Sequence, residues 1–546
     1  MALRVALGQF NASVGDIGGN VDSMRGYYCR AQEFKADLLV FPEMCVCGYP
    51  PEDLLHKPHF IEDSMAAIQT LAKATGEMVV VAGFAEQVGD CCYNSLAVMR
   101  NGKIEKIYRK GVLPNYGVFD EKRYFCAGTE PLVIDLNGAK VVFTICEDIW
   151  DLKWLDEFLG SEAKPDLLLN LSASPFHVGK VGQRRKVVSD CTKHLHCAAA
   201  YCNLVGGQDE LVFDGRSMFV DCSGTVVCQA AAFEEDLLVA DIITDNSAIE
   251  VVNATGASRG GFADLGPVAE VYQALVLGTA DYVFKNGFKK VIIGLSGGID
   301  SSLTAAIAVD ALGSENVRGV TMPSKFNTAE TISDAGLLAE NLGIEFDTVP
   351  IADVLETFDK TLDVIDGWSD DGVAFENLQA RIRGTLLMSI SNQLGCMVLT
   401  CGNKSETAVG YSTLYGDTAG GFAVIKDVPK TMVYRLSEYV NEKYAREVIP
   451  VSVITRPPSA ELREGQVDAD SLPDYYLLDA ILKGYIEMDK SADTLVEEGC
   501  PADLVKRVTR LVDLNEYKRR QSPPGLKITP KAFGRDRRMP ITNKYR

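Results

Sequence analysis

The chain has 546 residues, which is enough for two to four domains of ordinary size and excludes a single small binding module as a first interpretation. Lysine and arginine total 54 and aspartate and glutamate total 75, so the formal net charge is −21. An acidic chain repels phosphate backbones, which argues against nucleic acid as a partner and leaves only a local basic groove for a nucleotide.

The sequence contains no apolar run near the roughly 20 residues that a membrane-spanning helix needs. The stretch from Met1 to Phe10 alternates in polarity and predicts a strand, without the basic start and long apolar run of a signal peptide. We therefore expect a cytoplasmic protein with no membrane partner. Its 15 cysteines, none arranged as Cys-x-x-Cys, are expected to be mostly reduced core thiols.

The first part of the chain, residues 1–245, is rich in short strands. Apolar runs at Val79–Phe84 and Lys140–Cys146 predict two of them. Asn94–Arg100 and Lys103–Arg109 flank Asn101-Gly102, the strongest short hairpin signal. Helical stretches lie between the strands, at Val21–Phe34 and Ile61–Thr75. This mixture indicates sheets covered by helices.

Residues 246–265 are small and polar and predict a connector, after which a strand–helix–strand rhythm runs through residues 266–546. Strands are expected at Lys290–Leu295, Val317–Met322, Phe346–Ile351 and Met397–Cys401. Helices are expected at Ser302–Leu312, at Ala329–Leu342, and along the apolar stripe of Leu378, Ile382, Leu386, Ile390 and Leu394. This alternation predicts a doubly wound parallel sheet.

A glycine- and serine-rich loop, Leu295-Ser-Gly-Gly-Ile-Asp-Ser-Ser302, joins the first of these strands to the next helix. Glycines let the backbone approach a ligand, and the amides at a helix start attract an anion. Asp300 would repel phosphate unless a cation lay between them, so it predicts a Mg²⁺ ligand. The Walker Gly-Lys-Ser/Thr is absent, which argues against kinases and GTPases. The predicted phosphate-binding residues are Leu295, Ser296, Gly297, Gly298, Ile299, Asp300, Ser301 and Ser302.

The Ser-Gly-Gly-x-Asp-Ser loop resembles that of the ATP pyrophosphatases, which adenylate a carbonyl oxygen. Five later motifs resemble those of NAD synthetases, at Glu376–Arg383, Thr400–Glu406, Gly410–Asp417, Asp427–Thr431 and Arg456–Leu462. The resemblance implies ATP contacts from Cys401 and Lys430, with Glu406 joining Asp300 on Mg²⁺. It also implies deamido-NAD contacts from Asn377, Glu406, Asp417 and Lys527. Relatives often have threonine in place of Cys401. Arg381 and Arg383 are suited to neutralise nucleotide phosphates.

Three chemically different groups stand at the ends of predicted strands in the first part of the chain, where sheet enzymes place their sites. Glu43 follows one strand, Lys110 the hairpin, and Cys146 a third strand at an expected helix start, where a thiol is tilted toward the thiolate. Together they could hydrolyse an amide: Cys146 attacks the carbon, Glu43 takes its proton and Lys110 stabilises the oxyanion. Taken singly, each could be an ordinary core cysteine or surface charge.

The contexts of these residues, Leu39–Glu43, Arg109–Tyr116 and Thr144–Trp150, resemble the nitrilase superfamily of amidases. The resemblance runs from residue 3 to the region of residue 240 and includes Asp214–Met218. It implies an αββα sandwich and a second glutamate, Glu121, that orients the lysine and the substrate. Matches to glutamine-binding positions of two-domain NAD synthetases fall at Tyr116, Ser174 and Lys180. Several relatives have arginine in place of Lys180, and lysine cannot clamp a carboxylate in bidentate fashion.

One apparent metal cluster, Cys191, His194, His196 and Cys197, lies in a segment predicted to be helical from Gln183 to Ala200. On a helix, positions 194 and 196 point far apart. We therefore expect no zinc site there.

These resemblances identify the chain as a member of the glutamine-dependent NAD(+) synthetases. The expected fold class is α/β: an αββα nitrilase-like glutaminase domain (1–245), a connector (246–265), and a Rossmann-like ATP-pyrophosphatase domain (266–546). Glutamine would supply ammonia for the ATP- and Mg²⁺-dependent amidation of deamido-NAD, with no other cofactor. The family also implies an internal ammonia tunnel and a homo-oligomer. Two alternatives stay open: a stand-alone nitrilase-type amidohydrolase with a regulatory ATP-binding domain, and a non-catalytic nucleotide-sensing scaffold.

Overall fold

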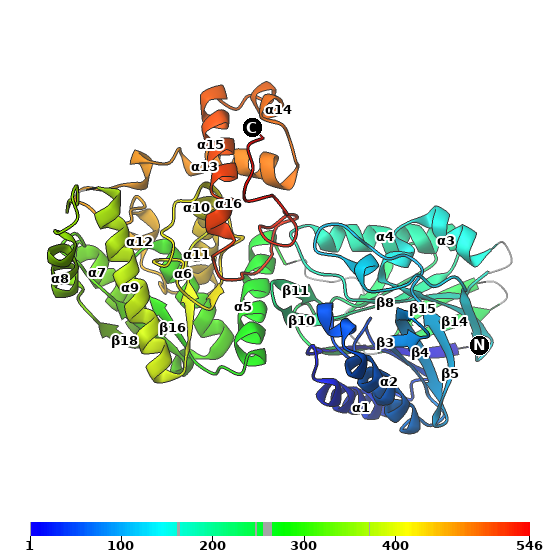
Figure 1. Cartoon of the computed structure of the whole chain (residues 1–546). Coiled ribbons are helices and arrows are strands. Elements are labelled where there is room, and N and C mark those ends of the chain that lie inside the picture. The colour runs from blue at the N-terminus through cyan, green and yellow to red at the C-terminus, as the bar shows by residue number, and fades with distance from the viewer. Residues whose placement is uncertain (1, 161–163, 246–247, 255–264, 371, 546) are drawn as a thin grey trace. The chain divides into compact units, whose positions relative to one another are not determined.

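A computed structural model describes residues 2–160, 164–245, 248–254, 265–370 and 372–545. The chain divides into two compact units, Met1–Asp264 and Leu265–Arg546 (Figure 1). Both units mix helices and strands, which confirms the predicted α/β class.

Two sheets form the centre of the first unit, with strand orders β15-β14-β1-β2-β3-β4-β5 and β13-β12-β9-β8-β7-β6. The first sheet contains β1 (Ala2–Gln9), β2 (Leu38–Val40), β3 (Val79–Val88), β4 (Cys91–Arg100), β5 (Lys103–Arg109), β14 (Asp236–Asp245) and β15 (Ala248–Asn253). The second contains β6 (Leu132–Leu136), β7 (Ala139–Ile145), β8 (Leu167–Ser172), β9 (Ala198–Asn203), β12 (Met218–Val220) and β13 (Val226–Gln229). A separate hairpin joins β10 (Val205–Gln208) to β11 (Leu211–Asp214).

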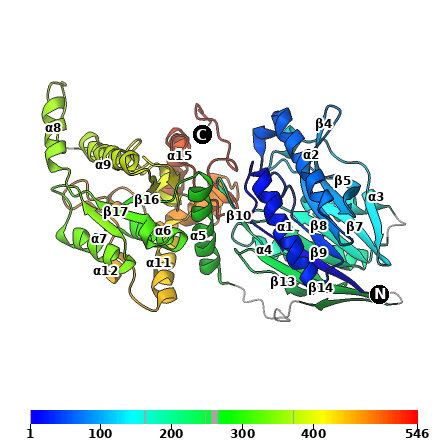
Figure 2. The ribbon, with the colours of Figure 1, turned by 90° about the horizontal axis from the view of Figure 1, so that it is seen from below.

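The two sheets face each other across one apolar core, and helices cover their outer faces. Val5 and Leu7 of β1 share a buried cluster with Phe143 and Leu169 of the second sheet, whereas Ala6 faces the opposite way. This alternation follows from the two-residue period of a strand. The covering helices are α1 (Ile17–Glu33) and α2 (Pro58–Lys73) on the first sheet and α3 (Leu152–Leu159) and α4 (Lys180–Leu195) on the second (Figure 2). The unit is therefore the predicted αββα sandwich.

Two local expectations differ from the structure. Residues 248–253 were expected in the connector but form β15, because Ile249 and Val251 alternate with polar residues and extend the first sheet beside β14. The rest of the predicted connector, residues 246–247 and 255–264, lies outside the described residues. The helix predicted through Ala200 ends at Leu195, since His196 turns left-handed at a φ of 53° and β9 begins at Ala198.

The second unit is built on one parallel sheet with strand order β18-β17-β16-β19-β20. Its strands are β16 (Val291–Gly294), β17 (Val317–Thr321), β18 (Glu345–Thr348), β19 (Met397–Thr400) and β20 (Phe422–Ala423). Its longer helices are α5 (Pro267–Lys285), α6 (Ile299–Leu312), α7 (Ala329–Leu342), α8 (Ala352–Leu362), α9 (Val373–Leu394), α11 (Lys430–Tyr444), α13 (Tyr475–Leu482) and α15 (Ala502–Leu514). Shorter helices are α10 (Lys404–Val409), α12 (Val451–Thr455), α14 (Ala492–Glu497) and α16 (Glu516–Arg519).

Strand order in this sheet creates a crevice at its carboxyl edge. After β16 the chain moves outward through β17 and β18, and it later returns to the other side of β16 with β19. Helices lie on both faces, with α8 and α9 packed on one and α6, backed by α5 and α11, on the other (Figure 2). Ligands of doubly wound folds bind where the strand order reverses, here between the loops after β16 and β19.

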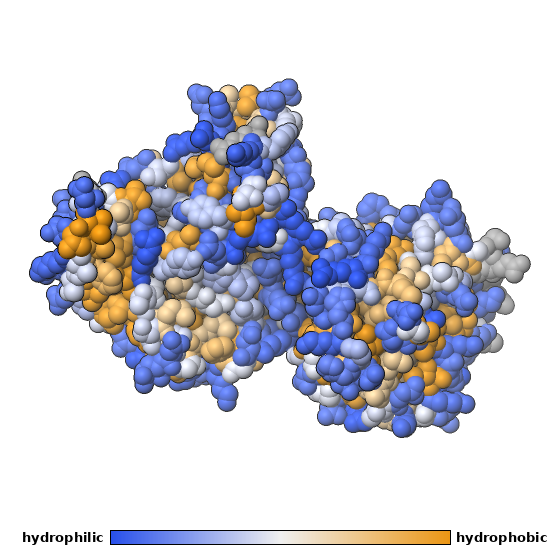
Figure 3. Space-filling model, in the orientation of Figure 1, coloured by the Kyte–Doolittle hydropathy of each residue, from blue (hydrophilic) through white to orange (hydrophobic). Residues whose placement is uncertain are grey.

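One disulfide joins two of the 15 cysteines. Cys91 and Cys126 form it with Cα atoms 5.8 Å apart, and the remaining 13 cysteines are free. Within the part of the chain that the structure describes, no helix combines the length and apolarity needed to cross a bilayer. Exposed apolar side chains gather around α8, at Phe358, Val364 and Ile365 (Figure 3).

Candidate active sites

A buried cluster of three charged side chains, Glu43, Lys110 and Glu121, lies near the ends of strands in the first unit. Lys110, directly after β5, places Nζ 2.7 Å from Glu43 Oε1 and 2.9 Å from Glu121 Oε1. Burial alone would lower the pKa of Lys110, but Glu121 and Glu43 outweigh it and raise that pKa well above its usual value. Lys110 is therefore a permanent cation at neutral pH, which suits a group that stabilises an oxyanion.

Glu43, three residues beyond β2, is held by donors from three other segments. Its Oε1 also accepts from Asn94 Nδ2 at 2.8 Å, and its Oε2 accepts from the backbone amide of Ala173 at 2.8 Å. Only 1% of its side chain is exposed. The carboxylate is thus fixed in orientation, as a proton acceptor in catalysis must be.

Cys146 lies at the end of β7 on a left-handed backbone, with a φ of 45°, where a 3₁₀ turn runs from Cys146 to Ile149. Burial raises the pKa of its thiol well above the ordinary value, and the charge of Glu43 adds to this while that of Lys110 opposes it. All three groups therefore share one electrostatic neighbourhood. The prediction that a helix start favours the thiolate form of Cys146 is wrong. A four-residue turn has only a small dipole, and the effect of burial on the pKa of the thiol outweighs it. The raised pKa favours the protonated thiol, so a nucleophilic role for Cys146 would require a base.

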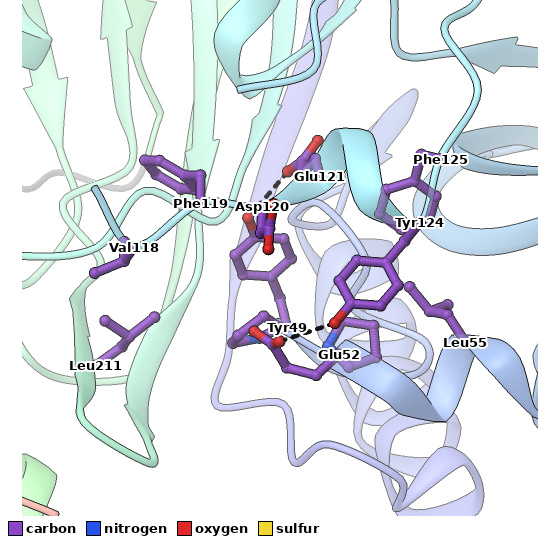
Figure 4. A pocket seen from close by; sticks show the side chains of 12 residues that line it. Tyr49, Glu52, Leu55, Val118, Phe119, Asp120, Glu121, Tyr124, Phe125 and Leu211 are labelled. Atoms are coloured by element: carbon purple, nitrogen blue, oxygen red, sulfur yellow. Dashed lines mark hydrogen bonds between the residues drawn. The ribbon is translucent and has the colours of Figure 1, made fainter. Parts of the chain in front are cut away.

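Glu121 also lines a pocket, together with Tyr49. Its Oε1 also accepts from the Tyr49 hydroxyl at 2.9 Å, while Oε2 is buried with no hydrogen-bond partner among the described residues. Burial raises the pKa of Glu121 to about 7, although Lys110 opposes this. The pocket has about 360 Å³ of space, part of it open to solvent (Figure 4). Its walls include Tyr49, Leu55, Val118, Phe119, Glu121, Tyr124, Phe125 and Leu211.

The predicted glutamine-binding residues lie around the segment that follows the nucleophile. The Tyr116 hydroxyl donates to Glu147 Oε1 at 2.9 Å, and Lys180 Nζ lies 4.0 Å from the ring centroid of Trp150. Ser174 is buried and adjoins Ala173, whose amide holds Glu43. The structure therefore brings Tyr116, Ser174 and Lys180 to the neighbourhood of Cys146, where they remain predictions as substrate contacts.

Two members of the apparent metal cluster, Cys191 and His194 of α4, have other partners. His194 Nε2 lies 2.7 Å from Asp156 Oδ2, and the Cys191 thiol donates to the carbonyl of Ile149 at 3.2 Å. Among the described residues, no group of three or more His, Cys, Asp or Glu side chains is placed to hold a metal ion.

In the second unit the predicted phosphate loop, residues 295–302, joins β16 to α6. Gly297 has a φ of 79°, and a Cβ built there would lie 2.1 Å from the carbonyl oxygen of Thr331, so no larger residue fits. The serines brace the turn: Ser301 and Ser302 donate to the carbonyl of Gly298 at 3.0 and 2.9 Å. The loop thus presents the first-turn amides of a 14-residue helix at the sheet crevice, which suits an anion.

Lys430, the first residue of α11, lies between two carboxylates at this crevice. Its Nζ bonds Asp300 Oδ2 and lies 3.2 Å from Glu406 Oε1. Burial alone would lower the pKa of Lys430, but Asp300 and Glu406 outweigh it and raise the pKa above its usual value. Burial, with Asp300 nearby, raises the pKa of Glu406 to about 8. Lys430 is thus the cation that lies between these two carboxylates.

The donor set at this position fits Mg²⁺. Asp300 and Glu406 are hard oxygen ligands whose side chains remain 19% and 17% exposed. Asn403 holds the first by donating to Asp300 Oδ1 at 2.8 Å. Mg²⁺ characteristically binds one or two carboxylates and completes its shell with water and substrate phosphate. Asp300 itself belongs to the 295–302 loop, so a phosphate bound there would lie close to these carboxylates.

Four predicted residues of the second unit remain: Asn377, Asp417, Cys401 and Lys527. Asn377 and Asp417 meet at Thr413, whose hydroxyl donates to Asn377 Oδ1 at 2.6 Å and whose amide donates to Asp417 Oδ1 at 2.5 Å. Burial raises the pKa of Cys401, at the end of β19, to about 12, and Asp300 and Glu406 act on it. Lys527 is buried instead among the carbonyls of residues 529 and 530 and Asp536, 2.5 Å away. As a contact of deamido-NAD, Lys527 remains a prediction.

Two arginines named with these residues also have protein partners. Arg381 Nε donates to the carbonyl of Leu414 at 3.2 Å, next to the Thr413 junction. Arg383 Nε donates to the carbonyl of Met322, just beyond β17, at 3.0 Å. Burial lowers the pKa of Arg383 to about 10, with Glu461 opposing it.

Comparisons with known proteins cover the whole chain. A family model described as carbon-nitrogen hydrolase matches residues 4–247, and one described as NAD synthase matches residues 271–522. A glutamine-dependent NAD(+) synthetase of Thermotoga maritima is 46% identical over 572 residues, covering 100% of this chain and 99% of the relative. The solved structure of the glutamine-dependent NAD+ synthetase from Acinetobacter baumannii in complex with adenosine diphosphate is 44% identical, with 100% and 99% coverage and a TM-score of 0.79.

The chain belongs to the glutamine-dependent NAD(+) synthetase family. A further member, from Acinetobacter baylyi, is 44% identical over 546 residues and is covered to 99%. Family membership confirms the predicted pairing of a nitrilase-type unit with an NAD synthase unit in one chain.

The sequence analysis missed several side chains that this protein's fold places at its two candidate sites. In the first unit they are Asn94, Tyr49 and Glu147. In the second, Asn403 holds Asp300, and Asp468 lies where its charge acts on Lys430 and Glu406. Asn403 could have been found, since it stands in the Gly402-Asn-Lys-Ser motif. Asp468 could not, because it stands in no motif and reaches the site only through the fold.

Proposed function

We propose that this chain hydrolyses glutamine at Cys146 and uses the ammonia to amidate deamido-NAD with ATP and Mg²⁺. One observation carries the proposal: each unit assembles a buried lysine between two carboxylates beside the group expected to react. In the first unit that group is the Cys146 thiol, and in the second it is the phosphate loop.

At the glutaminase site, Cys146 Sγ forms a bond to the amide carbon as its proton passes to Glu43. Lys110 stabilises the oxyanion that develops. Glu43 then returns the proton to the leaving nitrogen, so that ammonia departs and a thioester remains. Water, deprotonated by Glu43, cleaves the thioester, and glutamate and the free thiol are released.

At the synthetase site, the amides of residues 296–302 bind the phosphates of ATP. Asp300 and Glu406 would hold Mg²⁺, which supplies charge neutralisation for the departing pyrophosphate. A carboxylate oxygen of the nicotinate ring attacks the α-phosphorus, and pyrophosphate leaves. Lys430, displaced from the carboxylates, is placed to follow the pyrophosphate charge. Ammonia then attacks the acyl carbon, AMP leaves, and NAD results.

Isotope tracing tests the proposal. With glutamine labelled at the amide nitrogen, ATP, Mg²⁺ and deamido-NAD, we expect the label in the amide of NAD, together with one pyrophosphate per NAD. Excess unlabelled ammonium tests the family's internal passage: retained label supports a tunnel, and diluted label contradicts it. Release of glutamate with no pyrophosphate would favour the alternative, an amidohydrolase regulated by ATP. We also propose from the family that the protein is a homo-oligomer; light scattering during size-exclusion chromatography would measure its molar mass.

A further inference from the structure

Asp148 is a fully buried carboxylate two residues beyond the nucleophile, and both of its oxygens are saturated with donors. It accepts four hydrogen bonds: Oδ1 from the amides of Gly111 at 3.0 Å and Val112 at 2.8 Å, and Oδ2 from the amide of Ile145 at 2.8 Å and the hydroxyl of Tyr108 at 2.7 Å. The reaction described above makes no use of this group.

The donors come from two distant places in the sequence. Ile145 is a local partner, three residues away, as in the capping of a short turn. The other three lie 36 to 40 residues away, around the end of β5. A carboxylate needed only to cap the turn after Cys146 would not also gather both amides that follow Lys110.

Two of these donors are chain neighbours of the proposed catalytic residues. Ile145 directly precedes Cys146, and Gly111 directly follows Lys110. One rigid carboxylate thus stands one residue away from the backbone of each. Because side chains move with their own backbone, a carboxylate bonded next to both residues can influence how far the thiol lies from the ammonium.

We propose that Asp148 is a positioning residue of the glutaminase site, which holds the strand end of Lys110 against the turn of Cys146. This proposal rests on the proposed function. The left-handed backbone of Cys146 gives the tie a second role, because such a conformation persists only where its surroundings determine it. Asn170 supports the turn from the other side, donating to the carbonyl of Cys146 at 3.5 Å.

The test compares Asp148→Asn with Asp151→Asn in the full-length chain. Asparagine at 148 keeps one acceptor oxygen but turns an amino group toward backbone amides, which cannot accept. We expect kcat for glutamine hydrolysis to fall about 100-fold, the scale of a misplaced catalytic group, while KM for glutamine changes less than about threefold. Asp151 also caps a helix start, accepting from Lys153 and Trp154, but it touches neither catalytic strand end. Asp151→Asn should keep wild-type kcat.

The outcomes are distinct. A folded Asp148→Asn protein with wild-type kcat, or one whose loss lies in KM alone, overturns the proposal. If that variant does not fold, Tyr108→Phe decides: losing one donor should lower kcat about three- to tenfold at constant KM, and an unchanged kcat overturns the proposal. Synthesis from ammonium should be unaffected in all three variants. A wild-type protein that hydrolyses no glutamine would instead contradict the proposed function.

Discussion

The two units solve different problems with the same arrangement, a lysine between two carboxylates. In the first unit, Lys110, Glu43 and Glu121 are 1–5% exposed and carry further bonds from other segments. In the second, Lys430 is equally buried, but Asp300 and Glu406 are 17–19% exposed at the crevice. The first arrangement is closed and the second is accessible from outside.

This difference indicates different uses of the lysine. Buried charges are tolerated when paired and hydrogen-bonded, so we expect the first arrangement to be already assembled when substrate binds. In the second, an ammonium lies between two carboxylates, groups of the kind that Mg²⁺ binds. Binding of Mg²⁺ and ATP would then separate Lys430 from the carboxylates, whereas Lys110 keeps its partners throughout.

The largest expected effect separates the two chemistries. Cys146→Ala should lower glutamine-supported NAD synthesis by about 10⁴-fold or more, since no other group replaces the nucleophile, and leave synthesis from ammonium intact. Asp300→Asn should abolish synthesis from either nitrogen source but preserve glutamine hydrolysis. NAD and glutamate are measured in parallel. Loss of ammonium-supported synthesis in folded Cys146→Ala protein would show that the division of labour is wrong.

Replacing each lysine by methionine tests the contrast between closed and accessible arrangements. Lys110→Met leaves two carboxylates buried without their cation, and we expect about 3–5 kcal/mol of lost unfolding free energy for the first unit. Lys430→Met should cost less than half as much, because water and Mg²⁺ can reach its carboxylates. Denaturant unfolding with and without Mg²⁺ measures both.

The matched control is Lys186→Met, which removes an exposed ion pair with Asp190 on α4 and should change stability by less than about 1 kcal/mol. Equal losses for Lys110→Met and Lys430→Met would remove the distinction drawn between the two sites.

The pH dependence of glutamine hydrolysis should report on Glu121. Its pKa is raised to about 7, so above pH 7 it is ionised and paired with Lys110, and below pH 7 it takes up a proton and weakens that pair. We expect kcat/KM for glutamine to fall as pH decreases through 7, by at most tenfold per unit. Glu121→Gln should be less active and should lose this limb. A limb that persists unchanged in Glu121→Gln belongs to another group.

The smallest effect concerns the rim of the glutaminase site. Lys180→Met should raise KM for glutamine about tenfold, the value of one charge-assisted hydrogen bond, with little change in kcat. Lys180→Arg should keep or lower KM, since a guanidinium can grip a carboxylate with two bonds. Lys186→Met, on the same helix, is again the control. If KM for glutamine is unchanged in both Lys180→Met and Lys180→Arg, Lys180 does not contact the substrate.

Much of the fold was predictable because its signals are local. The helix Ala329–Leu342 and the strand Lys103–Arg109 have the bounds that periodicity and turn residues predict. The reversal of strand order could also be anticipated, since alternating strands and helices predict a doubly wound sheet. What failed was local as well: β15, with its apolar Ile249 and Val251, was assigned to the connector, and α4 ended early where a histidine adopts a left-handed turn.

The sites were predictable as sets of residues but not as geometries. Motifs named Asp300 and Lys430, yet 130 positions separate them, and only the fold shows that they bond each other. The raised pKa of Cys146 depends on burial, which no motif encodes. Likewise Lys527 stands in a basic tail in the sequence, but the fold surrounds it with carbonyls and Asp536.

The cation that rests over Trp150 has a practical consequence. The chain has three tryptophans, of which Trp154 stacks on Phe158 and Trp368 belongs to the other unit. An indole senses a charge held 4.0 Å from its ring, so drawing Lys180 toward an incoming carboxylate should change the light that Trp150 emits. If Lys180 contacts glutamine as proposed, Trp150 would act as a built-in fluorescent reporter, and occupancy of the amide-donor site could be followed by titration without any label.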